Sequence, residues 1–399
     1  MNRIKSIKTM KHIALISIIC LFAGMVYAQI ATNEQPYGLQ AGKKVQQQNS
    51  VVLSPPDRAR IAAEDSINDR AFGSLRYAYP IHVNYTLENS GAWQQLKDGS
   101  KLWRLKVNIP DALSTNTYYD AFWLPEGSKF FVYSEETGQS IGAITSEYIA
   151  GNRDKPIKFA TALIHGENVV YEYYQPASVV DTPIISISRI DYGYRYVNNP
   201  YQGGLRGFGD SDPLNININC PEGANWQIEK HAVARVSVSG PLGSTWCSGA
   251  LINNTKNDYT PYFLTAWHCI REVGLDAIDN NDASQWIFYW DYEHPDCYNS
   301  PIEPAHKTTV GATIVANFDP NRLAHSTDFA LLLLHQDPRN VVGFSPYYLG
   351  WDRSGNTGIV RLLWSDNLVG INQHGQYFLY ANIFYIRHIS YSNATNQHL

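Results

Sequence analysis

Residues 246–269 read WCSGALINNTKNDYTPYFLTAWHC. Two short apolar runs flank a polar turn rich in Asn, Asp and Lys, a pattern that predicts two antiparallel strands joined by a turn. The second run ends at His268, with Cys269 directly behind it. A histidine at a strand end can keep one ring face open to the following loop. The alternative is a packed histidine with no chemical role.

The composition favours a β-rich globular protein. Of 399 residues, 44% are hydrophobic and 17% are charged, which is enough apolar side chain to form a core. Short Val, Ile, Thr and Tyr runs, separated by Gly and Pro, predict strands joined by turns throughout the chain. The net charge of −5 offers no basic patch for nucleic acid, and we expect no nucleic-acid partner.

The N-terminus predicts export. Residues 1–11 are basic, residues 12–26 are apolar, and Val26 and Ala28 supply small side chains before Gln29. This pattern is typical of a secretory signal peptide cleaved after Ala28. The apolar run is short for a membrane anchor, which needs about 20 residues. We therefore expect a secreted protein, extracellular or periplasmic, that does not associate with a membrane after signal removal.

Export changes how the cysteines are interpreted. Cys20 leaves with the signal, and four cysteines remain within one short region: Cys220, Cys247, Cys269 and Cys297. In an oxidising compartment four cysteines predict two disulfides, with three possible pairings.

The rest of the chain divides by composition. Residues 29–70 are polar and predict a flexible or loosely docked leader with one short helix, and 71–197 predict an antiparallel β-sandwich. The Gly-, Asn- and Pro-rich stretch 198–213 predicts a linker. Strand patterns resume from 214.

Residues 246–269 resemble the first half of a chymotrypsin-fold serine peptidase. The wider match, from NINCPEGANWQIEKHAVARV (217–236) to YYLGWDRSG (347–355), resembles the secreted bacterial lysyl-endopeptidase-like group. LPEGSKFFVY (124–133) and VVYEYYQP (169–176) resemble the pro-region of that group. The resemblance implies an all-β protein with a β-sandwich-like pro-region and a double β-barrel. It also implies that His268 is the general base and that disulfides join Cys247 to Cys269 and Cys220 to Cys297.

A carboxylate must orient such a base. Asp328 precedes an apolar run, residues 329–333, so it stands at the mouth of a predicted buried strand. A carboxylate there needs a hydrogen-bond partner, and the ring N–H of a histidine would supply one. Asp328 also follows His268 in the chain order of the chymotrypsin class. The alternative is a solvated aspartate that caps the strand.

The nucleophile is the missing part. Such a serine lies on a Gly-Asp-Ser-Gly-type turn whose backbone N–H groups form the oxyanion hole. After Asp328, Ser354 belongs to a strand-turn motif, and no other serine is flanked by glycines. The Gly-Asp-Ser at 209–211 precedes His268 and continues with Asp212, so we interpret it as part of the linker. We identify no nucleophile.

The tail departs from the family pattern after Gly355, and residues 358–399 lack alternating apolar positions. A reading-frame change or truncated gene would explain this, as would a divergent ending. The residues that would set a preference for lysine fall in the same region. We therefore expect an incomplete second barrel and no peptidase activity from this chain. Expected domains are a signal peptide (1–28), a leader and pro-region (29–205), a trypsin-like peptidase part (206–357) and an atypical tail (358–399).

Two further interpretations use the same residues. His268, Cys269, His294 and Cys297 could mimic a zinc site, but exported cysteines favour disulfides and we expect no metal or cofactor.

There are two alternatives to a peptidase: a non-catalytic pseudopeptidase that binds peptides or a protein, and a non-functional gene fragment. Protein or peptide substrates are the expected partners, and the oligomeric state is not predicted.

Overall fold

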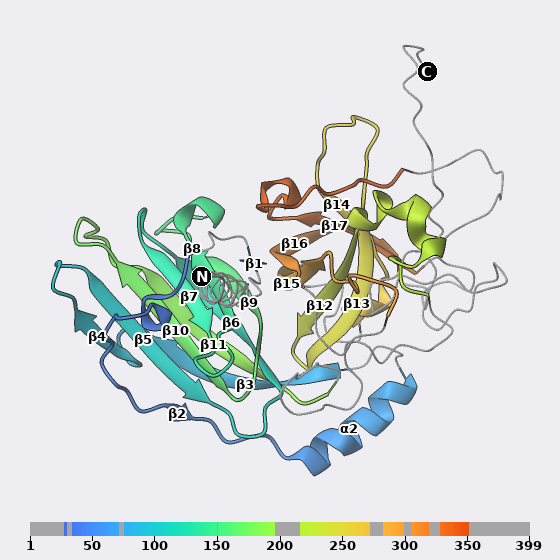
Figure 1. Ribbon diagram of the computed structural model, residues 1–399. Helices are drawn as coiled ribbons and strands as arrows, with labels where there is room; N and C mark the ends of the chain where they lie inside the picture. Colours follow the sequence, from blue (N-terminus) through green and yellow to red (C-terminus); the bar gives the residue numbers. More distant parts are fainter. Residues whose placement is uncertain are drawn as a thin grey trace, which may run out of the picture.

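The computed structural model describes residues 28–29, 34–71, 76–149, 151–195, 216–271, 282–298, 305–318 and 328–350. It contains two β-rich halves that lie side by side, with one longer helix, α2 (Arg58–Ala71), along the edge of the molecule (Figure 1). The predicted signal sequence up to residue 27, the linker and the tail lie outside the described residues.

The C-terminal half is a closed barrel of six antiparallel strands. The strand order is β12-β15-β16-β17-β14-β13, and β12 also pairs with β13, which closes the ring. Among the described strands of this half, the closed ring leaves no unpaired edge. The strands are β12 (Val233–Gly240), β13 (Gly243–Ile252), β14 (Tyr262–Thr265), β15 (Asp282–Trp290), β16 (Lys307–Phe318) and β17 (Phe329–Leu334).

Side-chain periodicity explains which face of each barrel strand is buried. In β17 the buried positions are Ala330, Leu332 and Leu334, which alternate with half-buried ones, as expected for a strand with one face on a core. Strand β12 is different, because all eight of its residues are buried. One face of β12 lines the barrel interior, and the other packs against the N-terminal half.

The N-terminal half is a sandwich of two sheets. Aromatic side chains fill the space between them: Tyr119 and Phe122 of one sheet contact Phe130 of the other, at ring-centroid distances of 5.9 and 5.4 Å. The first sheet contains β2 (Val51–Val52), β4 (Ala92–Gln95), β5 (Lys101–Asn108), β7 (Lys129–Tyr133), β8 (Ser140–Ile144) and β10 (Asn168–Gln175). The second contains β3 (Arg76–Thr86), β6 (Ser114–Trp123), β9 (Ile157–His165) and β11 (Ile184–Gly193).

The second sheet of the sandwich continues into the barrel, because β3 pairs with β13. Together these strands and β1 (Ala28–Gln29), which pairs with β16, form one eleven-stranded sheet. The sequence did not predict this connection.

Part of the leader is fixed in place by a buried carboxylate. Glu172, fully buried on β10, accepts hydrogen bonds from the backbone N–H groups of Tyr37 and Gly38 at 2.5 and 3.0 Å. Arg104 lies 3.5 Å from the same carboxylate. The prediction of a loosely docked leader is therefore wrong for residues 37–38, because a buried carboxylate must be satisfied and these N–H groups do so. The predicted short helix of the leader corresponds to α2.

The predicted all-β fold class is confirmed. A sandwich-like N-terminal half precedes a closed six-stranded barrel, which corresponds to the first barrel of a chymotrypsin-like fold. The expected incomplete second barrel falls after β17, where the structure describes only residues 335–350. Within the described residues, no helix has the length and apolar character needed to cross a membrane.

Candidate active site

His268 and Asp328 meet at one end of the barrel. Strand β14 ends at Thr265, and His268 opens the short helix α3 (His268–Arg271) three residues later. Asp328 stands directly before β17, the neighbour of β14 in the sheet. Because β14 and β17 are antiparallel, the end of one lies beside the start of the other. Strand pairing therefore brings together two residues that are 60 positions apart.

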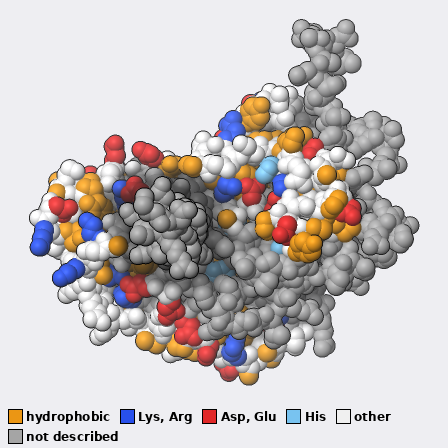
Figure 2. Space-filling model, viewed as in Figure 1, with side chains coloured by type: hydrophobic (Ala, Val, Ile, Leu, Met, Phe, Trp, Pro, Cys, Tyr) orange, Lys and Arg blue, Asp and Glu red, His pale blue; other side chains and the backbone are white. Residues whose placement is uncertain are grey.

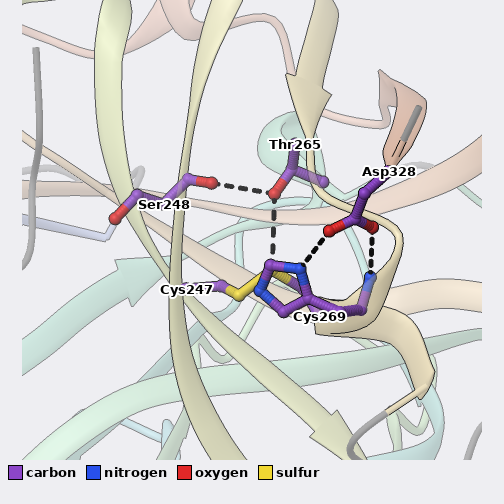
Figure 3. The surroundings of a disulfide bond; sticks show 6 residues. Cys247, Ser248, Thr265, Cys269 and Asp328 are labelled. Carbon is purple, nitrogen blue, oxygen red and sulfur yellow. Dashed lines mark hydrogen bonds and ion pairs between the residues drawn. A yellow bond between two sulfur atoms is a disulfide. The ribbon is translucent and has the colours of Figure 1, made fainter. Parts of the chain in front are cut away.

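Asp328 holds His268 through both the ring and the backbone. The ring Nδ1 lies 2.6 Å from Asp328 Oδ2, and the backbone N–H of His268 donates to Asp328 Oδ1 at 2.9 Å. Figure 3 shows the Asp328 carboxylate extending from the start of its strand toward the ring beside the disulfide. The side chains are 10% and 15% exposed, so bulk water competes little with these hydrogen bonds.

The electrostatics favour an ionised Asp328. Burial alone would raise the pKa of the Asp328 carboxyl, but the hydrogen bonds from the His268 ring and from the backbone N–H groups of His268 and Trp267 lower it more. The net pKa is therefore below the ordinary value for an aspartate. A charged carboxylate accepting from Nδ1–H leaves the lone pair of the imidazole on Nε2, which is the nitrogen a base uses in this chemistry.

A disulfide and a threonine hold the same region. Cys247 is bonded to Cys269, with a Cα–Cα distance of 6.2 Å, and this bond links β13 to the start of α3. His268 Nε2 lies 3.8 Å from the sulfur of Cys269. Thr265 Oγ donates to the backbone carbonyl of Ser248 at 2.8 Å, adding a second link between β14 and β13 (Figure 3). The sequence offered no signal for this contribution of Thr265.

The second disulfide joins Cys220 to Cys297, with a Cα–Cα distance of 4.4 Å. These two pairs are the ones that the resemblance implied. They also bear on the zinc interpretation: the sulfurs of Cys269 and Cys297 are in disulfides and cannot act as thiolate ligands. Among the described residues, the sulfurs of Cys247 and Cys269 and a ring nitrogen of His268 lie within 4.8 Å of one another, and the two sulfurs are joined in the Cys247–Cys269 disulfide.

The serines considered as nucleophiles, Ser354 and the Gly-Asp-Ser at 209–211, lie outside the described residues.

On the face seen in Figure 2, acidic and basic side chains are interspersed over both halves.

These features define the class of site: a buried aspartate orients a histidine at the edge of a closed β-barrel, next to a disulfide. Comparison with known proteins indicates which protein family the chain resembles. Residues 208–361 match the family described as "Lysyl endopeptidase, C-terminal domain". The lysyl endopeptidase of Pseudomonas aeruginosa is 25% identical to the chain over 221 residues, which cover 53% of this chain and 44% of that protein. The chain is therefore similar to lysyl endopeptidases over about half of its length.

Proposed function

We propose that the chain carries the histidine–aspartate part of a trypsin-like serine endopeptidase site, with His268 as the general base and Asp328 as the residue that orients it. The observation that supports this proposal is the 2.6 Å contact between His268 Nδ1 and Asp328 Oδ2. The substrates would be proteins or peptides met after export, as the signal pattern and the similarity to lysyl endopeptidases suggest.

In the proposed site each residue has a distinct task. Asp328 fixes the tautomer that carries hydrogen on Nδ1, so Nε2 can accept a proton from a hydroxyl group. When that proton arrives, the ring becomes cationic, and the adjacent carboxylate stabilises it. The Cys247–Cys269 bond and the Thr265 contact limit movement of the ring relative to β13, so the base keeps its position.

Hydrolysis also needs a nucleophile and an oxyanion hole, and the sequence contains no Gly-Asp-Ser-Gly turn to supply them. We therefore propose that the 399-residue chain does not itself cleave peptides. This same observation favours a second candidate, a pseudopeptidase that binds peptides or a protein without cutting them. A non-functional gene product is the third outcome.

Fluorophosphonate labelling of the purified, oxidised protein tests whether the chain has a reactive serine. We expect no labelled serine and no cleavage of Lys- or Arg-amide substrates, with trypsin as the positive control. If a serine is labelled in the natural chain but not in His268→Ala, the chain has a nucleophile and our proposal of inactivity is wrong, whereas the role of His268 stands. Label that persists in His268→Ala would contradict the role of His268 as well.

Proton NMR tests the histidine–aspartate pair independently of activity. A strong hydrogen bond from Nδ1–H to a carboxylate gives a low-field proton resonance, which we expect in the natural chain and not in Asp328→Asn. Asp154 is exposed, so Asp154→Asn is the matched control and should keep the signal. Absence of the signal from a folded natural chain would refute the pairing.

A further inference from the structure

The barrel and the sandwich share one sheet. Strand β13 of the barrel pairs with β3 of the sandwich through Ser244 with Ala78 and Thr245 with Arg76. Gly243 permits this close approach: it has φ +125°, and a Cβ at this position would lie 2.3 Å from the carbonyl oxygen of Ala78. A larger residue here would separate the strands. The sequence is therefore adapted to direct backbone pairing between the two halves.

Aromatic stacking continues the contact beyond the strands. Tyr77 stacks on Trp246, with ring centroids 4.1 Å apart and planes 14° apart. Tyr77 is fully buried, and its hydroxyl lies 2.6 Å from the hydroxyl of Ser237 on β12. A buried aromatic that also satisfies its hydroxyl on the partner surface is typical of the centre of a strong interface.

The apolar side chains on this face of the barrel belong to the core of the sandwich. Trp246, Ile287, Tyr289 and Val310 are buried in the same cluster as the aromatic residues of the N-terminal half. If that half left, these side chains would meet water together. A contiguous apolar patch of this kind is rarely exposed on a monomeric protein. This face of the barrel therefore needs another structural element packed against it to keep these side chains out of water.

Buried polar groups make the contact between the sandwich and the barrel specific. Arg189 forms an ion pair with the fully buried Asp191 at 2.5 Å and donates to the carbonyl of Gly240 in the barrel at 2.7 Å. Ser244 of the barrel donates to the same Asp191 at 2.6 Å. Gln285 donates to the carbonyl groups of two sandwich strands, β6 and β9, at 3.0 Å each. Separation of the halves would break these hydrogen bonds, and buried polar groups are costly to leave unpaired.

We propose that the N-terminal β-domain, residues 76–195, and the barrel form one cooperative unit that stays together without a covalent link between them. A cut in the connecting segment, residues 196–215, leaves the two parts as one non-covalent complex that unfolds in a single transition. This proposal does not depend on the peptidase assignment, because it rests on the interface alone.

A designed cut tests the proposal on the whole chain. The recognition sequence of a sequence-specific protease replaces part of 196–215, and the oxidised protein is purified, cut and diluted to nanomolar concentration. We expect the two parts to co-elute in size-exclusion chromatography and to give one thermal transition. Separation of the two parts at this concentration, or two transitions at different temperatures, would overturn the proposal.

Substitution of Tyr77 tests the interface at residue level. Tyr77→Ala should raise the Kd of the cut complex by at least about 30-fold, as truncation of a central interface aromatic does. Trp93, on β4 of the other sheet, is 39% exposed, so Trp93→Ala is the matched control and should change the Kd by less than about threefold. If Tyr77→Ala fails to fold, Tyr77→Phe removes only the hydroxyl contact with Ser237 and should raise the Kd by roughly 2- to 12-fold. Equal effects at positions 77 and 93 would contradict the proposal.

Discussion

Asp328 accepts two hydrogen bonds from one residue, His268: the ring nitrogen Nδ1 lies 2.6 Å from one carboxylate oxygen and the backbone nitrogen lies 2.9 Å from the other. The carboxylate therefore fixes both the ring and the turn that carries it. A substitution of Asp328 should alter the stability of the barrel as well as the orientation of the histidine.

Asp328→Ala should lower the free energy of unfolding by about 2–3 kcal/mol, because it leaves two N–H donors in a mostly buried site without their charged acceptor. Urea unfolding at neutral pH measures this change. Asp154→Ala, at an exposed position, should stay within about 0.5 kcal/mol of the natural protein. Similar values for the two variants would show that the Asp328 contacts contribute little to stability.

The stabilisation that Asp328 provides should depend on pH in a defined direction. Its folded-state pKa is lowered, so the stabilisation is present above the unfolded value of about 3.9 and is lost as the pH falls through the folded pKa. Urea unfolding of the natural chain and of Asp328→Asn, compared from pH 7 to pH 2, measures the difference. The stability gap between the two proteins should narrow below about pH 4. A gap that widens in acid would contradict the lowered pKa.

The two disulfides should contribute unequally. Cys220–Cys297 spans 77 residues and Cys247–Cys269 spans 22. The chain-entropy relation gives about 4.5 and 3.4 kcal/mol, respectively, at 25 °C. Replacing each pair by alanine and measuring urea unfolding should show the longer link to be the more stabilising by about 1 kcal/mol. The reverse order would indicate that local strain or residual structure in the unfolded chain outweighs loop entropy.

Signal cleavage should leave Gln29 as the first residue of the exported protein. Small residues at positions 26 and 28 suit signal peptidase, and replacing Ala28 by a large residue should block cleavage. Mass spectrometry of the intact exported protein measures the N-terminus. A protein that retains residues 1–28 would contradict the prediction of a signal peptide.

Local patterns accounted for much of the fold. Short apolar runs predicted the strand before His268 and the strand after Asp328, and the mixture of strand runs and turns predicted the all-β class. The same patterns could not predict the pairing of Ser244 with Ala78, because a strand edge carries no local sign of its partner. Nor could they predict the contact of Glu172 with Tyr37, since the sequence alone does not distinguish a buried glutamate from one on the surface.

For the candidate site, the motif around His268 and the position of Asp328 before an apolar run were sufficient to nominate both residues, and the structure brings them together. The contact of Thr265 with the carbonyl of Ser248 was not predictable, because a threonine in a strand is common and its partner is a backbone atom.

The sheet shared by the two halves has a consequence for the time the chain needs to fold. Tyr77 meets Ser237 across 160 residues of sequence, and Gln285 meets Tyr119 across 166. Contacts between residues so far apart in sequence stabilise the protein only after long loops have closed. The entropy lost on closing these loops slows folding in all-β proteins. The last strands of the barrel must also be synthesised before the ring can close. We therefore expect the barrel to form slowly, against a sandwich whose own strands are closer together along the chain.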